Sequence, residues 1–176
     1  AEKPKATLSL DENFQALFQR VYDGAVITDV HGQIVDVNVR AVDALQYERQ
    51  ELQGMRMTDV ISGSDESLIQ SLRENLEKDL FMLIQAFCIR KDGSVFPVEI
   101  AVNRLPLSDK DYLCFFVRDT TQRRKELELL RTEHNAIHNS GNGIGIATLD
   151  GRLEYVNPAT ARLWGYEQAT DVMGRD

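Results

Sequence analysis

The side chains that could carry catalysis or bind a metal are few in this chain of 176 residues. Its three histidines are His31, His134 and His138, and its two cysteines, Cys88 and Cys114, form no CxxC pair. His134 and His138 are four residues apart, so on a helix they would share one face and could hold a metal ion. No cysteine or carboxylate completes an obvious ligand set, so we expect no metal site. The cysteines are expected to be small buried hydrophobic residues.

Sequence patterns of nucleotide, acyl or zinc-protease chemistry are absent. The chain contains no GxSxG, HExxH or Walker pattern. Residues 141–145 are rich in glycine, but a phosphate loop follows a strand and opens a helix. Here a predicted helix comes before the glycines and a predicted strand after them, so the segment is interpreted as a turn. We expect no catalytic residue, and an enzyme fragment is only a remote alternative.

Composition and charge narrow the class of protein further. Hydrophobic residues make up 43% and charged residues 27%, with a net charge of −8 and a pI near 4.9. This composition is typical of globular proteins. The diffuse negative charge disfavours nucleic acid as a partner. No apolar run approaches the roughly 20 residues that span a bilayer, and the first ten residues do not resemble a signal peptide. The cysteine usage fits a reducing compartment, so we expect a cytoplasmic location.

An internal repeat organises the chain. Gly24 to Gly32 resembles Gly143 to Gly151, and at the same offset of 119 residues Val37-Asn38 matches Val156-Asn157. An offset of that size is a domain length rather than a solenoid period. The chain is therefore expected to hold one whole domain followed by the start of a second copy. The expected divisions are an extension at 1–10, a domain at 11–121, a linker helix at 122–138 and a truncated repeat at 139–176.

The elements of the first copy follow from periodicity and turn signals. Two strands flank the His31-Gly32 turn, and Asn38 is placed to cap a short helix. Alternating residues 96–103 follow the Asp92-Gly93 turn and predict a strand with one buried face. Pro97, which has no amide proton, is expected at an edge or bulge. The expected helices are one that opens at the capping box Ser9–Glu12 and ends at Gly24, one at 39–45, one or two turns within 48–61, and one from Ser64. The expected strands are 25–30, 33–37, 81–90, 96–103 and 112–118, with a loop at 105–110.

This order of elements predicts an α+β fold, an antiparallel sheet with helices on one face. The strand at 81–90 is apolar on both faces, so one face would remain uncovered by the core and needs a partner. The amphipathic N-terminal helix that carries Phe14, Leu17, Phe18 and Val21 is one cover. We expect a homodimer, formed through this helix, the outer sheet face or the Leu127–Ile137 seam. The residues expected in the core are Phe18, Ile27, Val35, Leu45, Leu72, Phe87, Val98, Ile100, Phe115 and Val117.

The last strand leads into a helix at residues 118–122. Asp119 or Thr120 is well suited to be the N-cap of this helix. Leu127, Leu130, His134 and Ile137 then recur at the spacing of a coiled-coil seam. Two heptads are too few to separate a coiled coil from a lone amphipathic connector, so the residues leave both open.

Several of these segments together resemble the PAS sensory domains. The first is Gly24–Asn38, followed by Leu45-Gln-Tyr47 and Gly54. The second is the hairpin Arg90–Glu99, and the third is the exit Val117-Arg-Asp-Thr-Thr-Gln-Arg-Arg124. The resemblance covers residues 11–125 and returns at roughly 135–176, where Tyr155–Ala159 and Leu163–Tyr166 are closer still to the family pattern.

The resemblance implies a PAS fold, with a five-stranded antiparallel sheet and helices enclosing a possible small-molecule pocket. It also implies a sensory or dimerising module of a signal-transduction protein, such as a two-component system with a histidine kinase or a cyclic-dinucleotide enzyme as output. The junction Asp119, Thr120 and Thr121 would transmit the signal to the exit helix. A ligand-free dimerisation platform is the alternative to ligand sensing.

The resemblance also bears on cofactors. A haem ligand would be expected on residues 65–80, which contain no histidine, and the covalent flavin of light-oxygen-voltage domains needs a cysteine near residues 48–56, which contain none. Haem and covalent flavin are therefore not expected. Met55 and Met57 are expected to fill the core. A non-covalent small ligand stays open, and its identity is unknown from the sequence.

Overall fold

The computed structural model describes residues 12–76, 81–107, 110–168 and 170. The predicted extension at 1–10 lies outside the described residues. The chain divides into two compact units, Ala1–Thr121 and Gln122–Asp176, which are described separately below.

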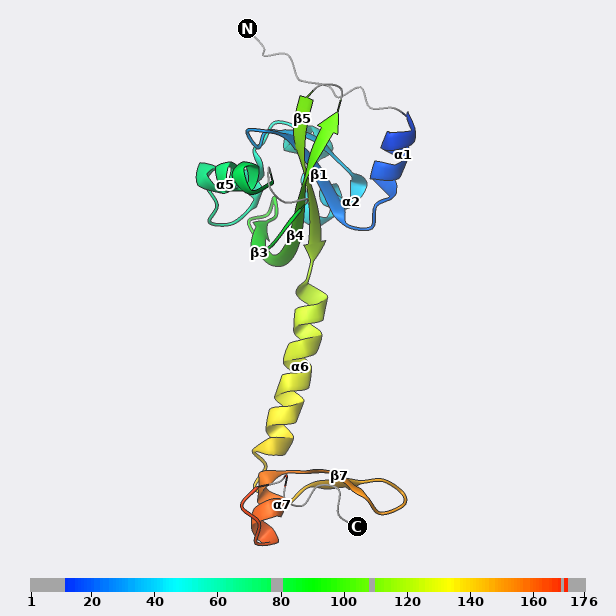
Figure 1. Ribbon diagram of the computed structural model, residues 1–176, viewed down its shortest axis with the longest axis vertical. Helices are drawn as coiled ribbons and strands as arrows, with labels where there is room; N and C mark the ends of the chain where they lie inside the picture. The colour runs from blue at the N-terminus through cyan, green and yellow to red at the C-terminus, as the bar shows by residue number, and fades with distance from the viewer. Residues whose placement is uncertain (1–11, 77–80, 108–109, 169, 171–176) are drawn as a thin grey trace. The chain divides into compact units, whose positions relative to one another are not determined.

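The first unit is built on a five-stranded antiparallel sheet. Its strands lie in the order β2-β1-β5-β4-β3, and every neighbouring pair runs antiparallel. With the helices that surround it (Figure 1), the sheet confirms the predicted α+β class and the PAS fold. The strands are β1 (Gly24–Asp29), β2 (Ile34–Val37), β3 (Met82–Ile89), β4 (Val95–Leu107) and β5 (Lys110–Asp119).

Two short turns set the hairpins. The Asp29 carboxylate accepts the backbone amides of His31 and Gln33, at 2.8 and 2.9 Å. Gly32 has a φ of +82°, which a residue without a side chain adopts without strain. In the second turn, Asp92 accepts the amide of Ser94 at 2.8 Å and Gly93 has a φ of +84°. The predicted turns at His31-Gly32 and Asp92-Gly93 are both present.

The inner face of the sheet packs on short helices and one longer helix. Side chains of Phe96, Val98, Ile100 and Phe115 from the sheet meet Leu45, Leu52, Met57, Ile69 and Leu72 in one continuous buried cluster. Asn38 caps the first of these helices, its carboxamide oxygen accepting the amide of Ala41 at 2.9 Å. The helices are α2 (Val39–Leu45), α3 (Arg49–Leu52), α4 (Met57–Val60) and α5 (Glu66–Leu76).

The outer face of the sheet is only partly covered. Helix α1 (Glu12–Arg20) lies on this face, where Phe18 packs with Ala25, Ile27 and Cys114 in a second buried cluster. Further along this face, Phe87 is 46% exposed, so its prediction as a core residue is wrong. The remaining nine predicted core residues are buried. Phe87 points away from the core because its neighbour Cys88 takes the inner position, and successive strand residues alternate between faces.

The hairpin of β4 and β5 extends further than predicted. Leu105 pairs with Tyr112 and Leu107 with Lys110, so the loop expected at 105–110 is strand for most of its length. β4 is an interior strand, but its end at Pro97 is an edge on the side of β5, as the sequence predicted. The ladder with β5 runs only from Val98 onward. The missing amide of Pro97 therefore falls just beyond the end of that ladder, where no partner is required.

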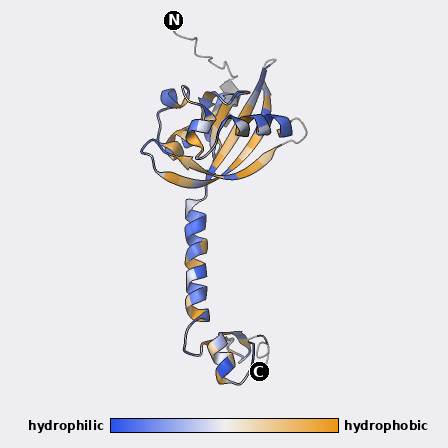
Figure 2. Cartoon of the chain, turned by 90° about the vertical axis from the view of Figure 1, so that its left-hand side faces the viewer, coloured by the Kyte–Doolittle hydropathy of each residue, from blue (hydrophilic) through white to orange (hydrophobic). Residues whose placement is uncertain are grey.

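The second unit contains α6 (Thr121–His138) except its first residue, then β6 (Gly145–Ala147), β7 (Leu153–Val156) and α7 (Pro158–Leu163). β6 and β7 form an antiparallel hairpin. No residue of α6 is buried, and Figure 2 shows that this helix is mostly hydrophilic with isolated hydrophobic positions. Among the residues that the structure describes, no helix is long and apolar enough to cross a membrane.

Candidate functional site at the exit of the sheet

The predicted transmission residues lie where β5 ends and α6 begins. The Asp119 carboxylate accepts the backbone amide of Thr121 at 2.8 Å. This bond satisfies one of the amides that have no partner inside the helix. Of the two residues proposed from sequence as the acceptor at this helix start, Asp119 is the one that takes this amide.

Thr120 has a different role from the expected one. Its amide and its hydroxyl both donate to the carbonyl oxygen of Pro97, at 3.0 and 3.2 Å. This carbonyl belongs to β4, so Thr120 fastens the exit of β5 to the neighbouring strand. The Thr121 hydroxyl is buried and has no hydrogen-bond partner among the described residues. The three predicted residues thus lie together at the junction, but only Asp119 and Thr120 form side-chain hydrogen bonds there.

Arg90 connects this junction to the rest of the domain. Its guanidinium pairs with the second oxygen of Asp119 at 3.2 Å and donates to the backbone carbonyl of Ala44 at 3.2 Å. The guanidinium carbon lies 3.8 Å from the centre of the Phe96 ring, a cation–π arrangement. One side chain therefore contacts the exit, the end of α2 and the core. Sequence reasoning missed Arg90, since its partner lies 29 residues away along the chain.

A second ion pair holds the end of β5 to the start of β1. Arg118 makes a two-pronged contact with the Asp23 carboxylate, at 3.0 and 2.9 Å. Because neighbouring strand residues point to opposite faces, Arg118 and Asp119 pair on opposite sides of the sheet. Two adjacent charged residues at a strand end, Arg118 and Asp119, must point to opposite faces. This pattern could have indicated that each forms an ion pair on its own side of the sheet.

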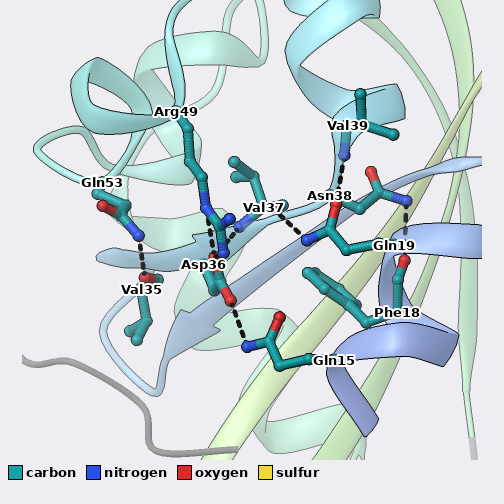
Figure 3. Close-up of polar contacts among 10 residues, drawn as sticks. All are labelled: Gln15, Phe18, Gln19, Val35, Asp36, Val37, Asn38, Val39, Arg49 and Gln53. Carbon is teal, nitrogen blue, oxygen red and sulfur yellow. Dashed lines mark hydrogen bonds and ion pairs between the residues drawn. The ribbon is translucent and has the colours of Figure 1, made fainter. Parts of the chain in front are cut away.

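Polar contacts also tie α1 to the hairpin of β1 and β2 (Figure 3). The buried carboxylate of Asp36 accepts from Arg49 and, at 3.2 Å, from the side-chain amide of Gln15 in α1. The carboxamide nitrogen of Asn38 donates to the backbone carbonyl of Phe18 at 3.3 Å. The sequence predicted Asn38 as a helix cap only, and these further bonds were not foreseen.

The other candidate chemical residues are dispersed. His31 lies in an exposed turn, and His134 and His138 lie exposed on α6 with ring centres 5.7 Å apart. Cys88 and Cys114 are buried, and burial raises the pKa of each thiol to about 12. Such thiols are protonated and unreactive at neutral pH. Within the described ranges, no group of three or more histidine, cysteine or acidic side chains could hold a metal ion.

A charged cleft lies on the surface, between the turn after β1 and helix α5. It has a volume of about 310 Å³, and its lining includes His31, Arg56, Glu66, Ile69 and Arg73. Arg56 pairs with Glu66 and donates to the carbonyl of His31 at 3.1 Å. The cleft borders the hydrophobic core at Ile69, which lines the cleft and also belongs to the buried cluster.

Family comparison assigns both units. A PAS domain model matches residues 23–122, which is more than half of the chain, and a second PAS domain model matches residues 131–176. The chain belongs to the PAS domain family. The resemblance noted from sequence is thereby confirmed.

Individual relatives agree with this assignment. The chain is 27% identical over 119 residues to a methyl sulfide methyltransferase-associated sensor from Methanosarcina acetivorans, covering 65% of this chain but 12% of that protein. Among solved structures, a PAS domain of an HTR-like protein from Haloarcula marismortui has a TM-score of 0.56 and 26% identity, over 61% of this chain and 88% of that one. A domain of a sensory box sensor histidine kinase/response regulator from Geobacter sulfurreducens has a TM-score of 0.52 and 24% identity, over 61% and 91%.

Proposed function

We propose that this chain is a sensory and regulatory module of a signal-transduction protein and that it relays its state through α6 to an output domain. The observation that carries the proposal is the double engagement of Asp119. One carboxylate oxygen accepts the first amide of α6 and the other pairs with Arg90. A change in the position of β3, β4 or α2 would therefore act on the start of the helix.

The energy of these contacts is of the right size for a switch. A cap of this kind stabilises a helix by about 0.5–2 kcal/mol. A difference of about 1.4 kcal/mol changes the ratio of two states tenfold. The contacts are therefore weak enough to leave the fold intact when they rearrange and strong enough to bias the helix between two arrangements.

The input that we favour is rearrangement of a homodimer. The side chains of the buried cluster pack between the sheet and α2–α5, and we infer an input that acts from the surface. On the outer face, Phe81, Leu83, Phe87 and Val95 are each about half exposed. This set, called here the β3 patch, fits a second copy of the chain. Its size and position also support the alternative of a ligand-free dimerisation platform.

The output domain, the cellular location and the role of α6 are also parts of this proposal. The similar Geobacter sulfurreducens domain comes from a sensor histidine kinase/response regulator, which supports a two-component protein with a histidine kinase as output. A cytoplasmic location, a coiled-coil role for α6 and a first domain at residues 11–121 fit this function. We assign no catalytic role to the chain itself.

A kinase fusion tests the relay. A histidine kinase is joined after residue 138, and its autophosphorylation is compared with and without charged substitutions in the β3 patch, Leu83→Glu and Phe87→Glu. We expect these substitutions to change kinase activity. Combining them with Asp119→Ala and Thr120→Ala should remove that response while the domain stays folded.

The matched control is Asp111→Ala. Asp111 lies at the other end of β5 and pairs with Arg104 at 2.6 Å, so this variant also removes a strand-end ion pair. It should leave the kinase response intact. A response that survives the loss of Asp119 and Thr120 would reduce these residues to structural contacts and contradict the relay.

A further inference from the structure

Asn38 forms a four-bond clamp in the first unit. Its carboxamide oxygen accepts the amides of Ala25 at 2.8 Å and Ala41 at 2.9 Å. Its carboxamide nitrogen donates to the carbonyls of Phe18 at 3.3 Å and Asp23 at 3.0 Å. The oxygen therefore joins β1 to the start of α2, and the nitrogen holds α1 and the segment after it.

Asn157 forms the same clamp in the second unit. Its oxygen accepts the amides of Ile144 at 2.9 Å and Thr160 at 3.0 Å. Its nitrogen donates to the carbonyls of Ile137 at 3.0 Å and Asn142 at 2.9 Å. Each of these four partners stands 119 residues after the corresponding partner of Asn38. The repeat seen in the sequence is thus reproduced bond by bond.

This correspondence shows which element of the first repeat the end of α6 matches. Phe18 is in α1, and its counterpart Ile137 is in α6, so the last turns of α6 occupy the place that α1 has in the first repeat. A second contact agrees. Gln15 of α1 meets Asp36, and their counterparts His134 and Tyr155 meet edge to face with ring centres 6.3 Å apart. The second PAS model also begins at residue 131, inside α6.

We propose that α6 belongs to both repeats: it is the exit helix of the first and, from about residue 131, the counterpart of α1 in the second. The second repeat therefore begins inside α6, before the division expected after residue 138 and close to residue 135, where the resemblance returned. Asn157 is the positioning residue that holds this helix end. If α6 moves as the proposed relay requires, Asn157 would pass that movement directly to the second repeat. Only this consequence rests on the proposed function.

Replacing asparagine by aspartate separates the two halves of the clamp. Asn157→Asp keeps an oxygen that caps α7 and accepts the amide of Ile144, but it loses the donor to Ile137 and Asn142. A carboxylate then faces two carbonyl oxygens, which repel it. Asn38→Asp makes the same change in the first repeat and is the matched control.

Hydrogen exchange of the whole 176-residue chain measures the result. Asn157→Asp should speed exchange of the amides in residues 133–139 at least tenfold, with α1 unchanged. Asn38→Asp should speed exchange in α1 and leave the end of α6 unchanged. Unchanged exchange at 133–139 in Asn157→Asp, or equal effects of both variants on α6, would overturn the assignment.

A measurement without substitution guards against a variant that fails to fold. In the unmodified chain, a clamped helix end should protect the amides of residues 135–139 at least as well as those of residues 125–129, whereas a free helix end frays and exchanges faster. Faster exchange at 135–139 would overturn the proposal. Because the relay is read from kinase activity and the clamp from exchange, either can fail alone.

Discussion

At the scale of single residues, two neighbouring threonines at the exit should respond differently to the same change. The Thr120 hydroxyl donates to the Pro97 carbonyl, whereas the Thr121 hydroxyl is buried without a described partner. Thr120→Val should lower the free energy of unfolding by about 0.5–1.5 kcal/mol, the usual contribution of one hydrogen bond. Thr121→Val should leave it unchanged or raise it slightly. Urea unfolding followed by circular dichroism measures both.

The two variants control for each other, because each exchanges a hydroxyl for a methyl group beside the same helix start. Valine and threonine have similar helix propensities, so the difference between the variants reports the bond to Pro97. Equal effects on the free energy of unfolding would show that the bond contributes nothing measurable.

The sequence predicted which residues lie at this junction but only some of the hydrogen bonds and ion pairs that they make. Asp119 could be placed as a cap because its spacing from the helix start is a local property of the chain. Arg90 could not, because its contact with Asp119 depends on the arrangement of β3, β4 and β5. Phe87 was misplaced for a related reason. A strand that is apolar on both sides gives no alternation from which to choose the inner face.

At the scale of elements, helix α1 packs over Cys114 but not over Cys88. Cys114 lies on the outer face beneath α1, beside Phe18, whereas Cys88 lies in the inner core. Phe18→Ala removes the α1 side chain that is buried against Cys114 and should uncover this thiol. Because burial is what raises its pKa, uncovering should return the thiol toward its ordinary pKa and raise its thiolate fraction.

Alkylation by iodoacetamide at pH 8 measures this effect. In the unmodified protein, a pKa of about 12 leaves only about 10⁻⁴ of each thiol as thiolate, so both cysteines should react slowly and speed up as pH rises. In Phe18→Ala, Cys114 should react at least about 100-fold faster while Cys88 stays slow. Equal acceleration of both thiols would indicate global unfolding rather than release of α1.

The elements themselves were largely predictable, because their signals are local. Turn residues at Gly32 and Gly93, the cap Asn38 and the apolar spacing of α5 placed most boundaries within a few residues. The sequence predicted a loop at 105–110, and proline, such as Pro106, is depleted in strands. Pairing with β5 extended β4 through it to Leu107. Cross-strand pairing is a tertiary effect that single-sequence propensity does not contain.

At the scale of the whole molecule, two apolar surfaces compete as the place where two copies meet. One is the β3 patch, and the other is the α6 seam of Leu127, Leu130, His134 and Ile137. Both are exposed to a similar degree. The β3 patch combines Phe81, Leu83 and Phe87, on and just before the edge strand β3, with Val95 at the start of the neighbouring β4. Monomers rarely leave such a surface open. The seam spans only two heptads, which is short for a stable coiled coil by itself.

We therefore expect the β3 patch to hold the homodimer. Leu83→Glu with Phe87→Glu places like charges opposite each other across the interface and should convert the protein to a monomer. Leu127→Glu with Leu130→Glu adds the same charge to the seam and should leave it dimeric. Because all four side chains are about half exposed or more, neither pair should unfold the domain. Size-exclusion chromatography with light scattering at micromolar concentration gives the masses. A monomer from the seam pair alone would move the interface to α6, and a monomeric unmodified protein would refute the dimer.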